Sequence, residues 1–409
     1  MRRPSSMRLA TTIGCLSLSS CLVACSDAAP AHDPSATSHG PDQPSCVVSP
    51  VDDGGSDDEA GDSPTGDDGG AGSAGAGGSD AGAGAGGSDA GVEPDGGEDS
   101  AHDDGGGDSG LSPRDRVLHY LRGISGTKTL SGIHNRHNTN PDQYTGQIHD
   151  VTGKYPAMWS GDFLFEQQDI DARQGMIDQA KTEWSHGAVV GIMYHACPPT
   201  QGESCGWDGG VLSHLSDAQW GDLVTDGGEL NAIWKSRLEV ISPFLQQLKD
   251  AGVAPLFRPL HEMNQGAFWW GGRPGPNGTR RLFQLTHDYL VGTKGLDNLL
   301  WVWDVQDLSW DFDQYDPGPG YYDIAALDVY GDGFTQAKYD AMVAVAGGNL
   351  IAIGECARLP RAWELDSQPG WTFFMSWSEL TFSDNSGQEI VDLYASPKVL
   401  TLDEMPGWD

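Results

Sequence analysis

The sequence predicts an α/β protein, a (β/α)8 TIM barrel preceded by a signal peptide and a disordered tether. Eight short apolar runs alternate with helix-like segments over residues 111–409, and eight strands close such a barrel. Each run ends in polar or aromatic residues, as expected where the carboxyl ends of parallel strands form a site. The competing fold is an open doubly wound sheet, but no G-x-G-x-x-G or G-x-x-x-x-G-K-[ST] motif follows any of the expected strands, so a nucleotide site lacks its fingerprint.

Residues 1–25 have the pattern of a lipoprotein-type signal peptide. Three Arg residues lie within the first eight positions, and an apolar stretch then covers about residues 9–24. It ends in L-V-A-C at Cys25, which resembles the lipobox of bacterial lipoproteins, whose Cys is diacylated after cleavage. An ordinary signal peptide and a short membrane anchor are the alternatives, although a spanning helix needs about 20 residues. We therefore expect export to a bacterial cell surface or outer membrane through a lipidated Cys25, with simple secretion as the alternative.

Residues 26–110 have the composition of a disordered acidic linker rich in Gly, Ser, Ala and Asp. They contain 20 of the chain's 59 acidic residues and no Lys or Arg. Such a segment cannot bury enough apolar surface to offset its ordering entropy, and its like charges extend it. The formal net charge of the whole chain is -36, which argues against a nucleic-acid partner because such partners bind basic patches.

Residues 111–409 contain all 14 Trp residues, and their length suits one domain with one core. The expected strands are Thr129–His134, Ala157–Phe163, Val189–His195, Pro255–Leu260, Leu299–Val305, Ile324–Tyr330, Leu350–Gly354 and Thr372–Trp377. The expected helices are Asp171–Ser185, Glu229–Asp250, Thr279–Val291, Thr335–Ala346 and Gln388–Tyr394.

Three of the seven Cys residues lie in this domain: Cys197, Cys205 and Cys356. Export permits disulfides, and the first two bound a short loop, CPPTQGESC. Their spacing does not match a metal site. We expect a Cys197–Cys205 bridge and a buried, free Cys356.

The stretch 255–273, PLFRPLHEMNQGAFWWGGR, organises the domain. Its apolar strand runs straight into Arg258, His261 and Glu262, so these side chains reach the carboxyl edge of the sheet. Glu355 ends the seventh strand in IAIGE, which places it across the barrel mouth from the fourth strand. Two carboxylates among many aromatic residues favour glycoside hydrolysis, in which one acts as acid/base and the other as nucleophile.

The strings FRPLHEMNQGAFWWGG, LDVYGD, IAIGE and WSGDF resemble glycoside hydrolase family 26, the β-mannanase family. The resemblance covers nearly all of residues 112–400, and the motifs follow the family's order. It implies a glycoside hydrolase catalytic domain over 111–409. His261 stands where related barrels carry an Asn before the acid/base. Cys356 departs from the pattern, because an apolar residue such as Phe is expected after the nucleophile.

By this resemblance Glu262 is the acid/base, Glu355 is the nucleophile and Tyr330 donates a hydrogen bond to the nucleophile. The resemblance also implies that five residues shape the sugar subsites: His195, Arg258, Trp269, Asp328 and Trp377. Their position at strand ends adds four further candidates for substrate binding: His134, Trp159, Asp162 and His261.

Less specific interpretations remain for several of these residues. A Glu at a strand end can serve only to bind an Arg, and Asp304 can be a site residue or a structural cap. Adjacent residues on a strand point to opposite faces, so one of Trp269 and Trp270 belongs to the core. Gln265 replaces the second His of H-E-x-x-H, and we expect no metal and no cofactor.

The resulting hypothesis is a monomeric, retaining, endo-acting β-mannanase that cuts β-1,4-mannosidic bonds in mannan, galactomannan or glucomannan. A β-1,3-1,4-glucanase or β-1,3-xylanase of the same family is the first alternative. A non-catalytic surface glycan-binding protein is the second, and the presence of both Glu residues argues against it.

Overall fold

A computed structural model describes residues 110–331 and 333–408. The predicted signal peptide, Cys25 and positions 26–109 of the predicted tether lie outside the described residues. Within them, no helix combines the length and the apolar character that crossing a membrane requires.

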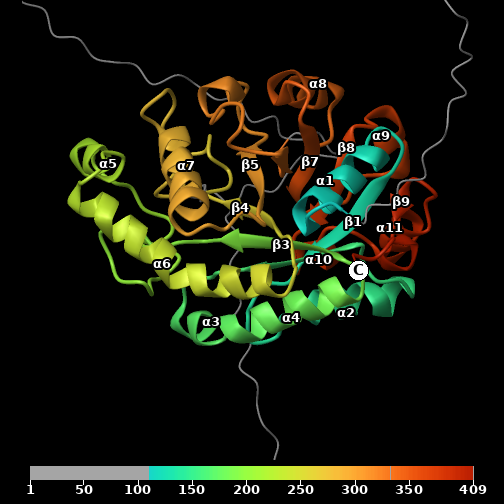
Figure 1. The fold of residues 1–409 in the computed structure, drawn as a ribbon. Coiled ribbons are helices and arrows are strands. Elements are labelled where there is room, and N and C mark those ends of the chain that lie inside the picture. Colours follow the sequence, from blue (N-terminus) through green and yellow to red (C-terminus); the bar gives the residue numbers. More distant parts are fainter. Residues whose placement is uncertain (1–109, 332, 409) are drawn as a thin grey trace, which may run out of the picture. The chain divides into compact units, whose positions relative to one another are not determined.

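The domain is a closed barrel of eight parallel strands with helices around it (Figure 1). Neighbouring strands pair in sequence order, and pairing of β1 with both β8 and β2 closes the ring. The strands are β1 Thr129–His134, β2 Met158–Asp162, β3 Val189–Tyr194, β4 Leu256–Pro259, β5 Leu300–Gln306, β6 Ile324–Val329, β7 Leu350–Cys356 and β8 Trp371–Ser376. A short β9, Val399–Leu400, pairs with β1 outside the ring. The predicted fold class is confirmed.

Helices fill the connections between strands and cover the outside of the barrel (Figure 1). The α-helices are α1 Pro113–Ile124, α2 Gln143–Thr152, α3 Gln167–Asp171, α4 Arg173–Ser185, α5 Asp217–Leu223, α6 Glu229–Asp250, α7 Thr279–His287, α8 Gln336–Ala346, α9 Ala362–Ser367, α10 Leu380–Ser383 and α11 Gly387–Tyr394. A π-helical turn, Asp288–Thr293, continues α7, and 3-10 turns occur at Phe312–Gln314 and Leu402–Glu404.

Local sequence explains where several helices begin. Ser112 caps α1 by accepting the backbone N–H of Asp115, and Pro113 supplies a preset φ at the first helical position. Ser386 and Glu389 form a reciprocal capping box at the start of α11. The predicted Glu229–Asp250 helix matches α6 residue for residue. The sequence interpretation missed α1, α2, α3, α5, α9 and α10.

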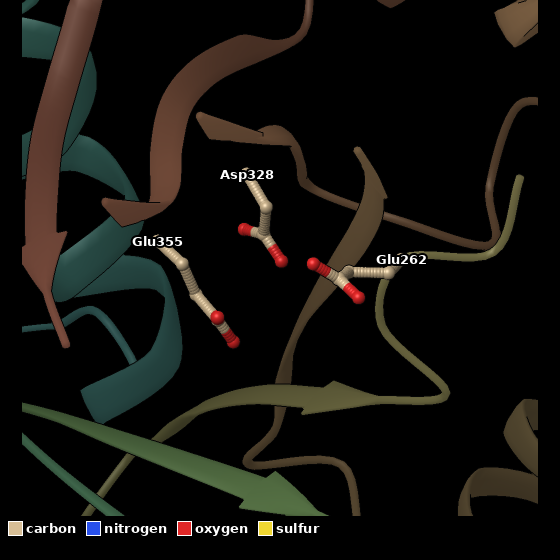
Figure 2. A group of neighbouring side chains, drawn as sticks. All are labelled: Glu262, Asp328 and Glu355. Carbon is tan, nitrogen blue, oxygen red and sulfur yellow. The ribbon is translucent and has the colours of Figure 1, made fainter. Parts of the chain in front are cut away.

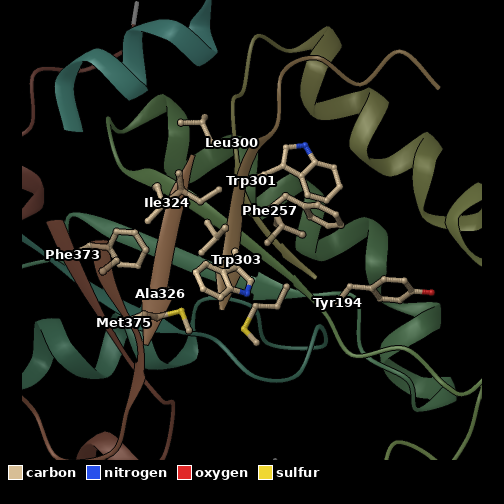
Figure 3. Packing of buried hydrophobic residues seen from close by; sticks show 14 of the residues in the cluster. Tyr194, Phe257, Leu300, Trp301, Trp303, Ile324, Ala326, Phe373 and Met375 are labelled. Carbon is tan, nitrogen blue, oxygen red and sulfur yellow. The ribbon is translucent and has the colours of Figure 1, made fainter. Parts of the chain in front are cut away.

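Strand parity separates the barrel interior from the helix layer. Phe257 and Trp301 meet edge to face with ring centroids 5.2 Å apart (Figure 3), and Trp301 also packs on Phe283 of α7. Trp301 therefore faces the helices. Residues an odd number of positions away on the same strands, Arg258 next to Phe257 and Asp304 three after Trp301, point into the barrel and meet each other there.

The loop after β3 is closed by a disulfide between Cys197 and Cys205. Cys356, at the end of β7, is buried and free. Both predictions about these cysteines are confirmed. The disulfide loop lies at the carboxyl end of the barrel, because it follows directly from β3 and packs against Phe165, which follows β2.

Candidate active site

The chain turns sharply after β4 to present Glu262. Leu260 and Glu262 have left-handed backbone conformations, with φ of 55° and 49°, which cost residues other than glycine roughly 1–3 kcal/mol each. Asp304 fixes the turn, because its Oδ1 accepts the backbone N–H of Glu262 at 2.8 Å. Trp270 Nε1–H donates to the carbonyl of His261 at 2.8 Å. The surrounding structure thus holds a strained backbone that aims the carboxyl into the barrel mouth.

Arg258 lies in the barrel below that turn and binds three carboxylates. Its Nη1 donates to Asp304 Oδ2 at 2.8 Å and to Asp328 Oδ2 at 3.0 Å, and its Nη2 donates to Glu355. Burial lowers the pKa of the guanidinium, but Asp328, Asp304 and Glu355 outweigh this and hold it well above its ordinary value. Arg258 therefore stays charged and positions Glu355.

Glu355 receives a second donor from the neighbouring strand. Tyr330 Oη–H donates to Glu355 Oε2 at 2.7 Å. Burial, together with Glu355 and Asp328, raises the pKa of Tyr330 well above its ordinary value, so the phenol remains a donor. In the pairing of β6 with β7, Leu327 opposes Ile353 and Asp328 opposes Glu355, which leaves Gly354 as an extra residue. This bulge re-aims the strand so that Glu355 points into the mouth.

Glu262 has a different environment. One amide, Gln265 Nε2–H, donates to its Oε2 at 2.5 Å. Burial raises the pKa of Glu262 well above its ordinary value, and the nearby Glu355 and Asp304 raise it further. Its carboxyl points toward those of Asp328 and Glu355 (Figure 2). One carboxyl oxygen from each of the three lies within 4.8 Å of the other two.

A cluster of histidines borders the pair. Asp162 accepts from His195 Nδ1 at 2.5 Å, and His134 Nε2 lies 3.8 Å from the same carboxylate. Burial raises the pKa of Asp162, but His195 and His134 outweigh it and hold that pKa below its ordinary range. Burial, His195 and Arg258 depress the pKa of His261 well below its ordinary value. His261 is therefore neutral. Its ring centroid lies 4.4 Å from that of His195 and its Nε2 lies 3.8 Å from Glu355, so it contacts both the histidine cluster and the carboxyl pair.

Aromatic rings form the walls. Trp377, half-buried, stacks on His134 with centroids 4.2 Å apart. Phe268 stacks on Trp270 at 4.5 Å, and both rings contact His195 and His261. Half-buried Trp207, two residues after the disulfide loop, contacts His195 and Phe268. Sequence reasoning missed Trp207, although its position two residues after Cys205 was a usable signal.

Two predicted sugar-binding residues lie elsewhere, which corrects those expectations. Trp269 is 1% exposed, packs on Trp234 of α6 and donates its Nε1–H to the carbonyl of Ala196. Trp159 is also 1% exposed, and its Nε1–H donates to the carbonyl of Pro141, which precedes α2. Both rings are part of the packing outside the barrel mouth, so neither offers a face to a sugar.

The other predicted residues divide into two groups by exposure. His134, Asp162 and Asp328 have no exposed surface, so they position their neighbours from behind. The remaining residues keep some exposure at the barrel mouth, with small exposed fractions or half-buried side chains: His195, Arg258, His261, Glu262, Tyr330, Glu355 and Trp377.

Among the described residues, Glu262, Asp328 and Glu355 are close enough together to share a cation. The Arg258 guanidinium already binds Asp328 and Glu355. A side chain thus already supplies positive charge to two of the three carboxylates.

Fold and site define the class: a (β/α)8 barrel with a close carboxyl pair at the carboxyl ends of β4 and β7 is built like a glycoside hydrolase. The chain belongs to glycosyl hydrolase family 26, whose model matches residues 112–404.

Individual relatives agree with this assignment. A mannan endo-1,4-beta-mannosidase of Thermothelomyces thermophilus is 31% identical over 304 residues, which are 71% of this chain and 60% of that protein. For a Piromyces mannan endo-1,4-beta-mannosidase A, 26% identical, the match spans 43% of its length and 63% of this chain. The chain thus spans only about half of these curated relatives.

Solved structures also match. GH26A from Muricauda sp. is 33% identical with a TM-score of 0.69, over 72% of this chain and 97% of that one. A Podospora anserina GH26-CBM35 β-(1,4)-mannanase is 27% identical with a TM-score of 0.62, over 73% of this chain and 68% of that one.

Proposed function

We propose that this protein is an endo-acting mannan endo-1,4-β-mannosidase that hydrolyses mannan, galactomannan or glucomannan with retention of configuration. The observation that carries the proposal is the unequal pair: Glu355 is bound by Arg258 and Tyr330, whereas Glu262 is held in an environment that favours its protonated form. The mannosidases among the relatives favour β-mannan as the substrate.

The geometry supports a double displacement. Glu355 attacks the anomeric carbon while Glu262 protonates the leaving oxygen, which gives a glycosyl-enzyme intermediate. Glu262, now ionised, then deprotonates a water that releases the sugar. Retaining enzymes place the two carboxyls about 5–5.5 Å apart and inverting enzymes about 6.5–9.5 Å apart. The oxygens of Glu262 and Glu355 within 4.8 Å of each other favour the retaining class.

Substrate and stereochemistry can be tested together. Purified protein is incubated with galactomannan, glucomannan, lichenan, β-1,3-xylan and β-1,4-xylan, and reducing ends are measured. We expect most activity on the mannans and oligosaccharides as early products. Proton NMR of the first products should show the β-anomer before mutarotation.

Preference for lichenan or β-1,3-xylan would favour the glucanase or xylanase alternative. Binding without turnover by the folded protein would favour a glycan-binding protein. An α-anomer as first product would contradict retention.

We further propose that a monomer acts on the polysaccharide at a bacterial surface or outer membrane, to which a lipidated Cys25 attaches it, with secretion as the alternative. The support for this location is the positive and apolar pattern before L-V-A-C at Cys25.

A further inference from the structure

Two carboxyl groups beneath the catalytic pair lie against each other. Asp304 comes from β5 and Asp328 from β6, and both accept a hydrogen bond from Arg258 Nη1. Asp304 Oδ2 and Asp328 Oδ1 lie 2.8 and 3.1 Å from this one nitrogen, so the two carboxyls are side by side. An ionised carboxylate only accepts hydrogen bonds, so the two carboxyls can bond to each other only if one of them carries a proton.

The space around this pair is adapted to it. A Cβ on Gly354 would lie 2.3 Å from Asp304 Oδ2 and 2.5 Å from Asp328 Oδ1. These two oxygens therefore occupy the volume that any other residue at position 354 would fill. The glycine before Glu355 thus admits both carboxyls beneath the bulge of β7.

Charge gives an independent reason for a proton. Four buried carboxyls, those of Glu262, Asp304, Asp328 and Glu355, surround the single guanidinium of Arg258. Tyr330 and His261 also face this group. The raised pKa of Tyr330 and the lowered pKa of His261 keep both side chains uncharged at neutral pH, so neither adds a charge. With Glu262 protonated, three ionised carboxylates would still face one cation in a dry interior, and buried charges of this kind are unfavourable.

We propose that Asp304 and Asp328 hold one proton between them, so that the pair carries a single negative charge. Asp304 then serves as a positioning residue for both catalytic groups. Its Oδ1 accepts the backbone N–H of Glu262, and its Oδ2 accepts from Arg258, which in turn binds Glu355. The roles given to Glu262 and Glu355 rest on the proposed function, whereas the shared proton does not.

Infrared difference spectroscopy tests the proton directly. The Glu262→Gln variant removes the other protonated carboxyl of the cluster and is compared at pH 7 with Glu262→Gln/Asp328→Asn and Glu262→Gln/Asp304→Asn. Each Asn is uncharged, so the partner left behind carries the single negative charge alone. We expect Glu262→Gln to show one carboxylic acid C=O band that both double variants lose.

If neither double variant loses a carboxylic acid band, both aspartates are ionised and the proposal fails. Circular dichroism verifies that each variant is folded, and either double variant alone suffices if the other does not fold. The bands do not depend on turnover. If the wild-type protein does not cut mannan but the double variants lose the band, only the proposed function is contradicted. If the wild-type protein cuts mannan but the double variants lose no band, only the shared proton is contradicted.

The pH profile of Asp304→Asn supplies a second readout. A nearby negative charge raises the pKa of Glu262, and this pKa sets the alkaline limb of kcat/KM. If the pair already carries one charge, Asp304→Asn leaves that charge on Asp328. The apparent pKa of the alkaline limb of kcat/KM then changes by no more than about 0.3 pH units. If both aspartates are ionised, the substitution removes a charge and the limb falls by about one unit.

Discussion

The two carboxyls proposed to be catalytic, those of Glu262 and Glu355, each have an oxygen within 4.8 Å of the other, in opposite surroundings. Glu355 follows the bulge near the end of β7 and accepts hydrogen bonds from Arg258 and Tyr330. Glu262 lies on a strained turn, and its carboxylate accepts from the neutral amide of Gln265. Charged and phenolic donors favour an ionised carboxylate, whereas burial beside other carboxylates favours a protonated one. The difference teaches that the positions of the donors, rather than the residue type, give the two glutamates the distinct surroundings that the proposed nucleophile and acid require.

Removing each carboxyl in turn should have the largest effect. Glu355→Ala should lower turnover of every substrate by on the order of 10⁴-fold or more, because no intermediate can form. Glu262→Ala should lower polysaccharide hydrolysis by about 10²- to 10⁴-fold. It should spare the first step on an aryl mannoside with a good leaving group, which needs little protonation. Steady-state kinetics on both substrates measure this difference.

Azide distinguishes the roles of the two Glu residues. It should give a glycosyl azide of inverted configuration with Glu355→Ala and of retained configuration with Glu262→Ala, because it replaces the nucleophile in the first variant and the activated water in the second. NMR of the products reads this directly. The reverse pattern would exchange the roles assigned to Glu262 and Glu355.

Tyr330→Phe sharpens the comparison on the Glu355 side. It removes one donor to a charged group, worth about 1.5–3 kcal/mol, so kcat/KM should fall about 10- to 100-fold. Tyr289→Phe is a matched control, since Tyr289 also donates to a glutamate at 2.7 Å, that of Glu239 on the protein surface. The control should leave kcat/KM unchanged. Equal losses in both variants would mean that Tyr330 has no special role at Glu355.

The smallest effect is expected on the Glu262 side. The hydrogen bond from Gln265 lowers the pKa of Glu262 against the larger effect of burial, so Gln265→Leu should raise that pKa further. The alkaline limb of kcat/KM should then move to higher pH by roughly half a unit. Gln388→Leu, which removes an exposed amide bonded to Asp392 on α11, should leave the profile in place. A limb that moves to lower pH would contradict this account of Glu262.

The sequence predicted the barrel well because apolar runs, polar strand ends and helix periodicity are all local signals. The eight expected strands overlap β1 to β8, and Glu262 and Glu355 come together as their strand positions indicated. The predictions that failed concerned which way individual tryptophan side chains point. Trp159 and Trp269 lie beside polar site residues in the chain, yet each turns outward into the packing.

Other features depend on contacts between distant segments, which one sequence does not reveal. Asp304 could be a cap or a site residue from its position alone. Only folding shows that it bonds Arg258, 46 residues away, and the backbone of Glu262. The bulge at Gly354 likewise depends on how β7 pairs with β6.

The disulfide between Cys197 and Cys205 has a practical consequence for producing the protein. It closes the loop that brings Trp207 against His195, and disulfides form in oxidising compartments. Protein made in a reducing bacterial cytoplasm would lack this cross-link, so the segment that carries Trp207 would be held less firmly beside His195. Expression should therefore be directed to the periplasm or to an oxidising strain, and thiol reductants should be left out of purification buffers.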